Sequence, residues 1–168
     1  QRMNRLVDQL LKVSRLDAAA IRLDEDVELN GLAAEVVAYP APLAIAAGKS
    51  VALVPANRPV RVTGSATALN DALRNLVENA LAHTPGGSEV TVTVTEDATI
   101  GVRDRGPGVP EAQRARIFER FWRAPGSGGT GAGTAADSSQ TARAHGGGVG
   151  IRDADGGGAE FILHLPRR

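Results

Sequence analysis

The apolar residues at the beginning of the chain recur at steps of three and four, which is the pattern of an amphipathic helix. The stripe lies within residues 1–17 and consists of Met3, Leu6, Val7, Leu10, Val13 and Leu16. Charged side chains occupy most of the positions between them. Because the stripe is narrow, as in coiled coils, we expect this helix to pack against a partner helix. A terminal helix folded against its own domain is the alternative.

The next part of the chain alternates between helical and strand patterns. Residues 29–47 are rich in Ala, Leu and Val at helical spacing, and two prolines bend or break this helix. Short apolar runs at 51–54 and 60–62 predict strands. A longer helix is expected after Ser65, whose hydroxyl suits an N-cap, and the Pro-Gly-Gly sequence at 85–87 ends it. Its buried face is expected to consist of Leu69, Leu73, Leu76, Val77, Ala80 and Leu81.

The second half of the chain predicts strands separated by a glycine-rich region. Valine and threonine alternate over residues 90–95, and a second apolar run follows at 100–102 after a turn. Residues 111–122 predict a short helix. Residues 124–148 are dominated by Gly, Ser, Thr and Ala, so we expect a mobile loop with a weak helix near its end. The last two strands are expected at 149–152 and 160–165.

The composition is that of an ordinary soluble globular protein, with 42% hydrophobic and 23% charged residues. The 19 basic and 19 acidic residues balance, so nothing predicts a nucleic-acid partner or a charged membrane surface. Cysteine is absent, which excludes disulfides and thiolate metal sites. No apolar run approaches the roughly 20 residues that a membrane-spanning helix needs. We therefore expect a cytoplasmic protein without a membrane segment.

Three possible ligand-binding motifs are excluded by the sequence around them. Gly48-Lys49-Ser50 matches the end of a P-loop, but the leading glycine is missing and the triplet precedes a strand. The glycines of 126–131 fit a dinucleotide fingerprint, yet no strand leads into them. The three histidines, His83, His145 and His164, lack the spacing of metal ligands.

The helix after Ser65 carries two asparagines, Asn75 and Asn79, which project from one face because they are four residues apart. That face differs from the leucine face. Amide oxygens at this spacing can bind a magnesium ion whose other ligands are water and phosphate. A solvent-facing or capping role is the alternative for an isolated pair.

A second polar motif follows the strand at 100–102. Asp104 at the strand end can accept a hydrogen bond from an exocyclic amine, and Gly106 and Gly108 let a flat ring approach the backbone. An ordinary Asp/Gly turn is the alternative.

Two more motifs follow: the aromatic segment 117–123 and a glycine-rich segment at 129–133, whose backbone N–H groups could bind phosphate at a helix N-terminus.

These four motifs, in this order, resemble the N, G1, F and G2 boxes of sensor histidine kinases, in the ATPase superfamily that also contains gyrase, Hsp90 and MutL. The resemblance covers nearly the whole chain, and its last part consists of Ala144-His145-Gly146-Gly147, residues 156–161 and Leu165-Pro166. It implies an α/β two-layer sandwich of the Bergerat ATP-binding type, with a mixed sheet covered by helices on one face. Residues 1–22 look like the second helix of the dimerisation hairpin. Residues 23–168 then form the ATP-binding domain, with an ATP lid at about 123–134.

The resemblance also assigns roles in binding ATP and Mg²⁺. It implies that Asp104 contacts adenine and that Asn79 holds the magnesium ion, with Asn75 and His83 on the same wall. Gly106 and Gly108 flank the base. The lid over the phosphates is shaped by Gly129, Gly131 and Gly133, and Arg120 and Arg123 contact phosphate or a docked partner.

One position bears on the type of reaction. Hydrolytic relatives such as gyrase have a glutamate where this chain has Asn75, and an amide is no general base at neutral pH. The site is therefore expected to hold ATP for phosphoryl transfer, with Glu78 as a weaker candidate base.

Three departures from the family lower the expected ATP affinity. Ala82 replaces a basic residue, Ala159 replaces a frequent threonine, and the segment after the lid is unusually polar, which predicts a frayed helix.

The H-box that carries the phosphoacceptor histidine in this family has no match in the chain. We therefore expect the ATP-binding half of a split kinase, which phosphorylates an H-box-containing partner protein. That partner would in turn transfer the phosphoryl group to a response regulator. Residues 1–17 could form a homodimer or a bundle with that partner. The alternatives are a fragment of a longer kinase, a degenerate nucleotide-binding regulatory module, and a serine kinase of the anti-sigma type, against which the N-terminal helix argues.

Overall fold

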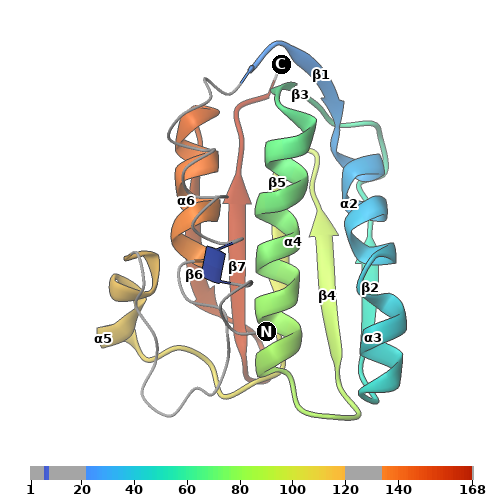
Figure 1. Ribbon diagram of the computed structural model, residues 1–168, viewed down its shortest axis with the longest axis vertical. Helices are drawn as coiled ribbons and strands as arrows, with labels where there is room; N and C mark the ends of the chain where they lie inside the picture. Colours follow the sequence, from blue (N-terminus) through green and yellow to red (C-terminus); the bar gives the residue numbers. More distant parts are fainter. Residues whose placement is uncertain (1–5, 8–21, 120–133, 168) are drawn as a thin grey trace.

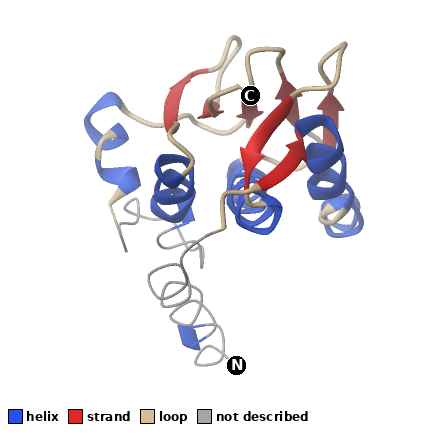
Figure 2. Cartoon of the chain, turned by 90° about the horizontal axis from the view of Figure 1, so that it is seen from above, coloured by secondary structure: helices blue, strands red, loops and turns tan. Residues whose placement is uncertain are grey.

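The computed structural model describes residues 6–7, 22–119 and 134–167. In these ranges the chain forms two layers, a five-stranded sheet and a set of helices on one face of it (Figure 1). Seen from above, the helices lie on one side of the strands and leave the other side of the sheet uncovered (Figure 2). The predicted two-layer α/β sandwich is confirmed.

The sheet is mixed, in the strand order β2-β4-β5-β7-β6. Its strands are β2 (Ser50–Val54), β4 (Glu89–Val94), β5 (Thr99–Arg103), β6 (Gly148–Asp153) and β7 (Ala159–His164). Only the β2–β4 pair is parallel, and the other neighbours are antiparallel. A separate two-stranded sheet pairs β1 (Glu25–Glu28) with β3 (Arg61–Gly64).

Alternation along β4 separates the two faces of the sheet. Val92 stands opposite Val102, which stands opposite Phe161, and all three are buried beneath the helices. The next row, Thr91, Arg103 and Glu160, faces the uncovered side of the sheet. Because successive side chains of a strand point to opposite faces, the valine-threonine pattern predicted this division.

The helices of the covered face are α2 (Leu29–Ala38), α3 (Ala41–Ala46), α4 (Ala66–His83) and α6 (Thr134–Ala144), with α5 (Glu111–Arg114) and the 3-10 helix η1 (Arg116–Phe118) outside it. The predicted interruption at the two prolines is confirmed, since Pro40 separates α2 from α3. Helix α4 lies in the centre, between α2 and α6 (Figure 1).

Helix α4 begins and is buried as its sequence predicted. The Ser65 hydroxyl accepts a hydrogen bond from the Ala68 amide at 3.3 Å, which satisfies one free N–H of the first turn. The expected face is buried, except that Leu81 is only half-buried. The buried residues of α4 are Ala68, Leu69, Ala72, Leu73, Leu76, Val77 and Ala80.

Two predicted elements differ in the structure. The helix expected at 111–122 is divided into α5 and η1, and the backbone is extended at Glu119, beyond which residues 120–122 lie outside the described range. The helix expected near the end of the 124–148 loop is present as α6, but at 11 residues, 134–144, it is longer and better packed than the weak, frayed helix that the polar sequence predicted. Its Ala, Ser and Thr side chains are small, so they allow close packing on α4 despite their polarity. The buried Ser138 hydroxyl, for example, donates to the Ala72 carbonyl oxygen at 2.9 Å.

The predicted N-terminal helix lies almost wholly outside the described residues. Leu6 and Val7 are helical and exposed, and the rest of the stripe is not described. Among the helices that are described, none combines the length and the apolar character that crossing a bilayer requires.

Candidate nucleotide-binding site

Asp104 follows directly after β5 and is 3% exposed. Its Oδ1 atom accepts hydrogen bonds from two backbone amides, that of Gly106 at 2.9 Å and that of Ala159 at 3.1 Å. These bonds stabilise a buried carboxylate and fix its orientation. The Oδ2 atom has no hydrogen-bond partner among the described residues. Asp104 therefore has one oxygen anchored in the fold and one whose hydrogen-bonding capacity is not used by the described residues.

The loop after Asp104 packs tightly on the end of α4. A Cβ atom at Gly106 would lie 2.4 Å from the carbonyl oxygen of His83, so no larger residue fits there without movement. The buried hydroxyl of Thr84 accepts a hydrogen bond from the Arg105 amide at 3.1 Å. Gly108 has a φ of +80°, which favours glycine. These contacts hold the Asp104 loop beside the C-terminal end of α4.

Three of the predicted site residues lie along one side of α4. Asn75 and Asn79 are half-buried and His83 is exposed. Their spacing of four residues places them on successive turns of that side. Since the Asp104 loop contacts the His83 carbonyl, the asparagine row and Asp104 meet at the same end of the molecule.

Helix α6 runs antiparallel to α4. Ser65 at the start of α4 bonds to His145 after the end of α6, whereas Ala72, further along α4, bonds to Ser138, earlier in α6. Continuing these pairs by four residues sets the first turn of α6 beside Leu76, between the two asparagines. The first N–H groups of a helix are free to bind an anion, so phosphate could lie between α6 and the asparagine row.

The remaining predicted site residues cannot be placed. Arg120, Gly129, Gly131 and Gly133 lie outside the described residues, as does Arg123. The described chain stops at Glu119 after η1 and resumes at the first residue of α6. The sequence also missed two residues that contact the Asp104 segment, Thr84 and Gly158. Ala159, noted in the sequence only as a departure from the family, bonds to Asp104 through its backbone. The glycine triplet before β7 was the available signal for Gly158.

A metal ion here would depend on phosphate. The described residues contain no group of three or more His, Cys, Asp or Glu side chains arranged to hold a metal. The half-buried amide of Asn79 offers the hard oxygen donor that Mg²⁺ prefers, and this ion usually keeps water and substrate phosphate as its other ligands. The residues therefore fit a magnesium ion that arrives with a nucleotide.

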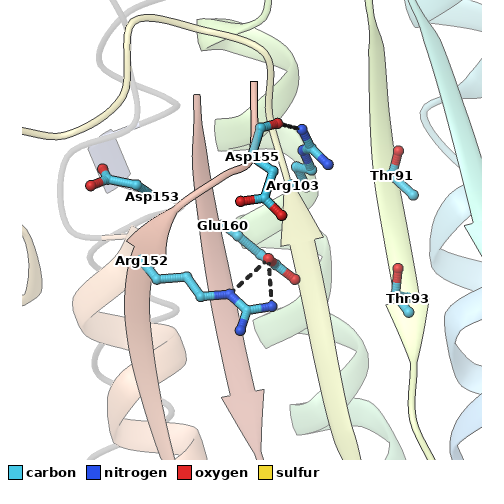
Figure 3. A pocket seen from close by; sticks show the side chains of 7 residues that line it. All are labelled: Thr91, Thr93, Arg103, Arg152, Asp153, Asp155 and Glu160. Carbon is cyan, nitrogen blue, oxygen red and sulfur yellow. Dashed lines mark hydrogen bonds and ion pairs between the residues drawn. The ribbon is translucent and has the colours of Figure 1, made fainter. Parts of the chain in front are cut away.

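A hollow of about 360 Å³ lies on the uncovered face of the sheet, away from these residues (Figure 3). Its lining consists of Thr91, Thr93, Arg103, Arg152, Asp153, Asp155 and Glu160. Arg152 pairs with Glu160 at 2.9 Å, and Arg103 donates to the Asp155 carbonyl oxygen. The lining thus contains one ion pair, Arg152 with Glu160, and a second arginine that is bound to the backbone. The hollow is distinct from the candidate nucleotide site.

Comparison with known proteins agrees with this geometry. The model of the family described as "Histidine kinase-, DNA gyrase B-, and HSP90-like ATPase" matches residues 64–168, more than half of the chain. The matched region contains α4, the Asp104 loop and α6. The chain belongs to this ATPase family. Family and fold together make it an ATP-binding catalytic domain of the sensor histidine kinase type.

Curated relatives and solved structures point to the same family. Sensor protein QseC of Escherichia coli K12 is 40% identical over 161 residues, which are 95% of this chain and 36% of that protein. The histidine-protein kinase AfsQ2 of Streptomyces coelicolor is 36% identical over 175 residues, 99% of this chain and 31% of that protein. The chain thus spans about a third of the length of these relatives.

Two structures of such kinases superimpose on the domain. Full-length ShkA in complex with AMPPNP aligns with a TM-score of 0.81 and 32% identity, covering 99% of this chain and 36% of that one. The cytoplasmic segment of QseC aligns with a TM-score of 0.68 and 29% identity, covering 98% of this chain and 87% of that one. The family fold therefore extends over the described residues on both sides of residues 120–133.

Proposed function

We propose that this domain binds Mg-ATP and transfers the γ-phosphoryl group to a histidine on a separate H-box-containing partner protein, which then phosphorylates a response regulator. The observation that carries the proposal is the Asp104 carboxylate, which is buried, oriented by two amides through Oδ1, and without a partner at Oδ2 among the described residues. A group held in this way suits the recognition of one amine.

Asp104 would accept a hydrogen bond from the exocyclic amine of adenine. The anchored carboxylate supports this role, because its free oxygen cannot rotate away without breaking two backbone hydrogen bonds. Gly106 and Gly108 would flank the base, and the lack of a side chain at Gly106 lets this loop pack closely on the end of α4. Recognition by one oriented carboxylate favours adenine over bases that present a carbonyl oxygen at that position.

Asn79 would hold the magnesium ion together with phosphate oxygens, and Asn75 and His83 would line the same wall. The position of the α6 N-terminus beside this row supports the proposal, because its free N–H groups attract negative charge. Gly129, Gly131, Gly133 and Arg120 are proposed to complete the phosphate side as the ATP lid. Bound Mg²⁺ would neutralise phosphate charge, and the chain's own residues would supply orientation.

Transfer to a protein is favoured over hydrolysis. Asn75 cannot take a proton from water at neutral pH, and Glu78 is exposed on a neighbouring position of α4. With no strong base beside the phosphates, the enzyme would require the incoming nucleophile to be positioned by a partner.

The chain's own histidines are poor acceptors. His145 is buried, and both of its ring nitrogens are hydrogen-bonded. His164 lies on β7, with Nδ1 3.0 Å from the Thr99 hydroxyl. His83 belongs to the proposed ATP wall. We therefore propose that the acceptor histidine comes from a partner that docks on this domain, with residues 1–22 as a hairpin helix that self-associates or joins a bundle with that partner.

The test is transfer from labelled ATP in the presence of Mg²⁺. The chain alone should remain unlabelled, and addition of an H-box-containing protein should give acid-labile phosphate on that protein. Asp104→Asn should abolish labelling at sub-saturating ATP. Label on His83, His145 or His164 of this chain would contradict transfer in trans. Failure to bind Mg-ATP at millimolar concentration would instead favour a regulatory module without catalysis.

A further inference from the structure

The imidazole of His145 joins the end of α6 to the beginning of α4. Its Nδ1 atom lies 2.7 Å from the carbonyl oxygen of Thr141, and its Nε2 atom accepts a hydrogen bond from the Ser65 amide at 3.0 Å. Since Nε2 accepts from a backbone N–H, the ring proton is on Nδ1 and donates to Thr141. The ring is 7% exposed and fully hydrogen-bonded.

The main chain of β3 has room for this ring only because residue 64 is glycine. A Cβ atom at Gly64 would lie 2.4 Å from Cδ2 and 2.6 Å from Nε2 of His145. No positive φ is recorded at Gly64, so an alanine there is strained by the ring and not by its backbone conformation. The pair Gly64 and His145 is therefore a fitted contact between β3 and the end of α6.

The rest of the contact between α6 and α4 is made of small side chains. The buried residues of α6 are Ala135, Ala136, Ser138, Ser139, Thr141 and Ala142. None of them is larger than threonine, so apolar burial specifies the position of α6 along α4 only weakly. Within the described part of the chain, two side-chain hydrogen bonds tie α6 to the segment of α4 and its N-cap, one from Ser138 to Ala72 and one between His145 and Ser65.

We propose that His145 is a positioning residue for the nucleotide phosphates, a role that rests on the proposed function. By anchoring the C-terminal end of α6 to the α4 N-cap, it sets where the N-terminal turn of α6 stands relative to Asn75 and Asn79. It acts from a distance, because an 11-residue helix is about 16 Å long. Asp104 is held by Gly106 and Ala159 and not by α6, so recognition of the base is independent of the link.

The experiment compares the affinity of the full chain for Mg-ATP and for adenosine. His145→Ala and Gly64→Ala should each weaken Mg-ATP binding by about tenfold, the effect of losing one buried hydrogen bond and the order that depends on it, and leave adenosine binding unchanged. Gly64→Ala should add nothing in the His145→Ala background, because the ring it strikes is gone. His145→Gln should recover part of the affinity, since its amide oxygen can accept from the Ser65 amide.

His164→Ala is the matched control, because this histidine also bonds a neighbour but lies exposed on β7. It should bind both ligands as the wild type does. Equal loss of Mg-ATP and adenosine affinity in His145→Ala, or additive effects of the two substitutions, would overturn the positioning role. Unchanged Mg-ATP affinity in His145→Ala would overturn it while leaving the proposed function intact. A wild-type chain that binds no Mg-ATP would overturn both.

Discussion

Asp104 and Ala159 are joined by two reciprocal hydrogen bonds. The Asp104 amide donates to the Ala159 carbonyl oxygen at 2.9 Å, and the Ala159 amide donates to the Asp104 carboxylate at 3.1 Å. The two residues are 55 positions apart in the chain, so the start of β7 holds the carboxylate that follows β5. Residues 120–133 and α6 lie between them in sequence. The proposed site for the base is thus built on the sheet, and the proposed phosphate side is built on the helices.

The first prediction concerns the free oxygen of Asp104. In Asp104→Asn the anchored oxygen can keep its bonds to Gly106 and Ala159, but an amide group that donates replaces the oxygen that accepts. We expect ATP affinity to fall by roughly 100-fold, because a hydrogen bond to a charged group contributes about 1.5–3 kcal/mol and two donors then face each other. Calorimetric titration with ATP measures this. A melting temperature close to that of the wild type would show that the fold is retained, and unchanged affinity would contradict the role.

A second prediction concerns Gly158, whose φ is +92° and where a Cβ atom would lie 2.2 Å from the Asp104 carbonyl oxygen. Gly157 is the matched control, since its φ is +102° and a Cβ atom there would meet nothing within 4 Å. Gly157→Ala should cost about 1–3 kcal/mol of unfolding free energy through backbone strain alone. Gly158→Ala should cost at least about 2 kcal/mol more, because strain and collision add. Urea unfolding of both variants measures the difference, and equal losses would contradict the collision.

The contrast between β4 and α6 shows what the sequence could predict. The valines and threonines of β4 alternate strictly, and the Ser65 cap is a local signal, so both elements were found. The length and burial of helix α6 were underestimated because its composition is polar. Its small side chains are buried against α4, and the sequence of α6 alone does not reveal this contact. The same limit applies to the site. Asp104 and the two asparagines were recognisable as candidates, but the backbone of Ala159 and the hydroxyl of Thr84 contact the Asp104 segment from distant positions in the chain, which no local pattern records.

A third prediction concerns pH. Glu28 caps α2, and its carboxylate accepts from the amides of Asn30 at 3.0 Å, Gly31 at 2.7 Å and Val60 at 3.3 Å. Burial raises the pKa of this carboxyl, but the three amides and Arg61 outweigh burial and hold the pKa below its ordinary value of 4.5. The folded state therefore binds this proton more weakly than the unfolded state does. The stabilisation is complete above the unfolded pKa and is lost as the pH falls through the folded one.

Glu28→Gln should accordingly destabilise the domain at neutral pH by about 1 kcal/mol, the usual worth of a helix cap, and by progressively less as the pH is lowered below 4.5. Denaturant unfolding between neutral pH and pH values below that point measures the dependence. The same substitution at the exposed Glu35, in the same helix, is the control and should leave the curve parallel to that of the wild type. A Glu28→Gln curve parallel to the wild type would show that this carboxylate is not the source of the pH dependence.

The last prediction separates the magnesium role of Asn79 from a purely structural one. If its amide oxygen binds the ion that accompanies ATP, Mg²⁺ should increase the ATP affinity of the wild type and should lose most of this effect in Asn79→Ala. Binding of ATP in the presence of a chelator should be the same for both proteins. Asn70→Ala is the matched control, because Asn70 is half-buried on the same helix but accepts a hydrogen bond from Arg74 at 3.3 Å. Asn70→Ala should respond to Mg²⁺ as the wild type does, and a loss of affinity in Asn79→Ala that persists in chelator would assign Asn79 to packing.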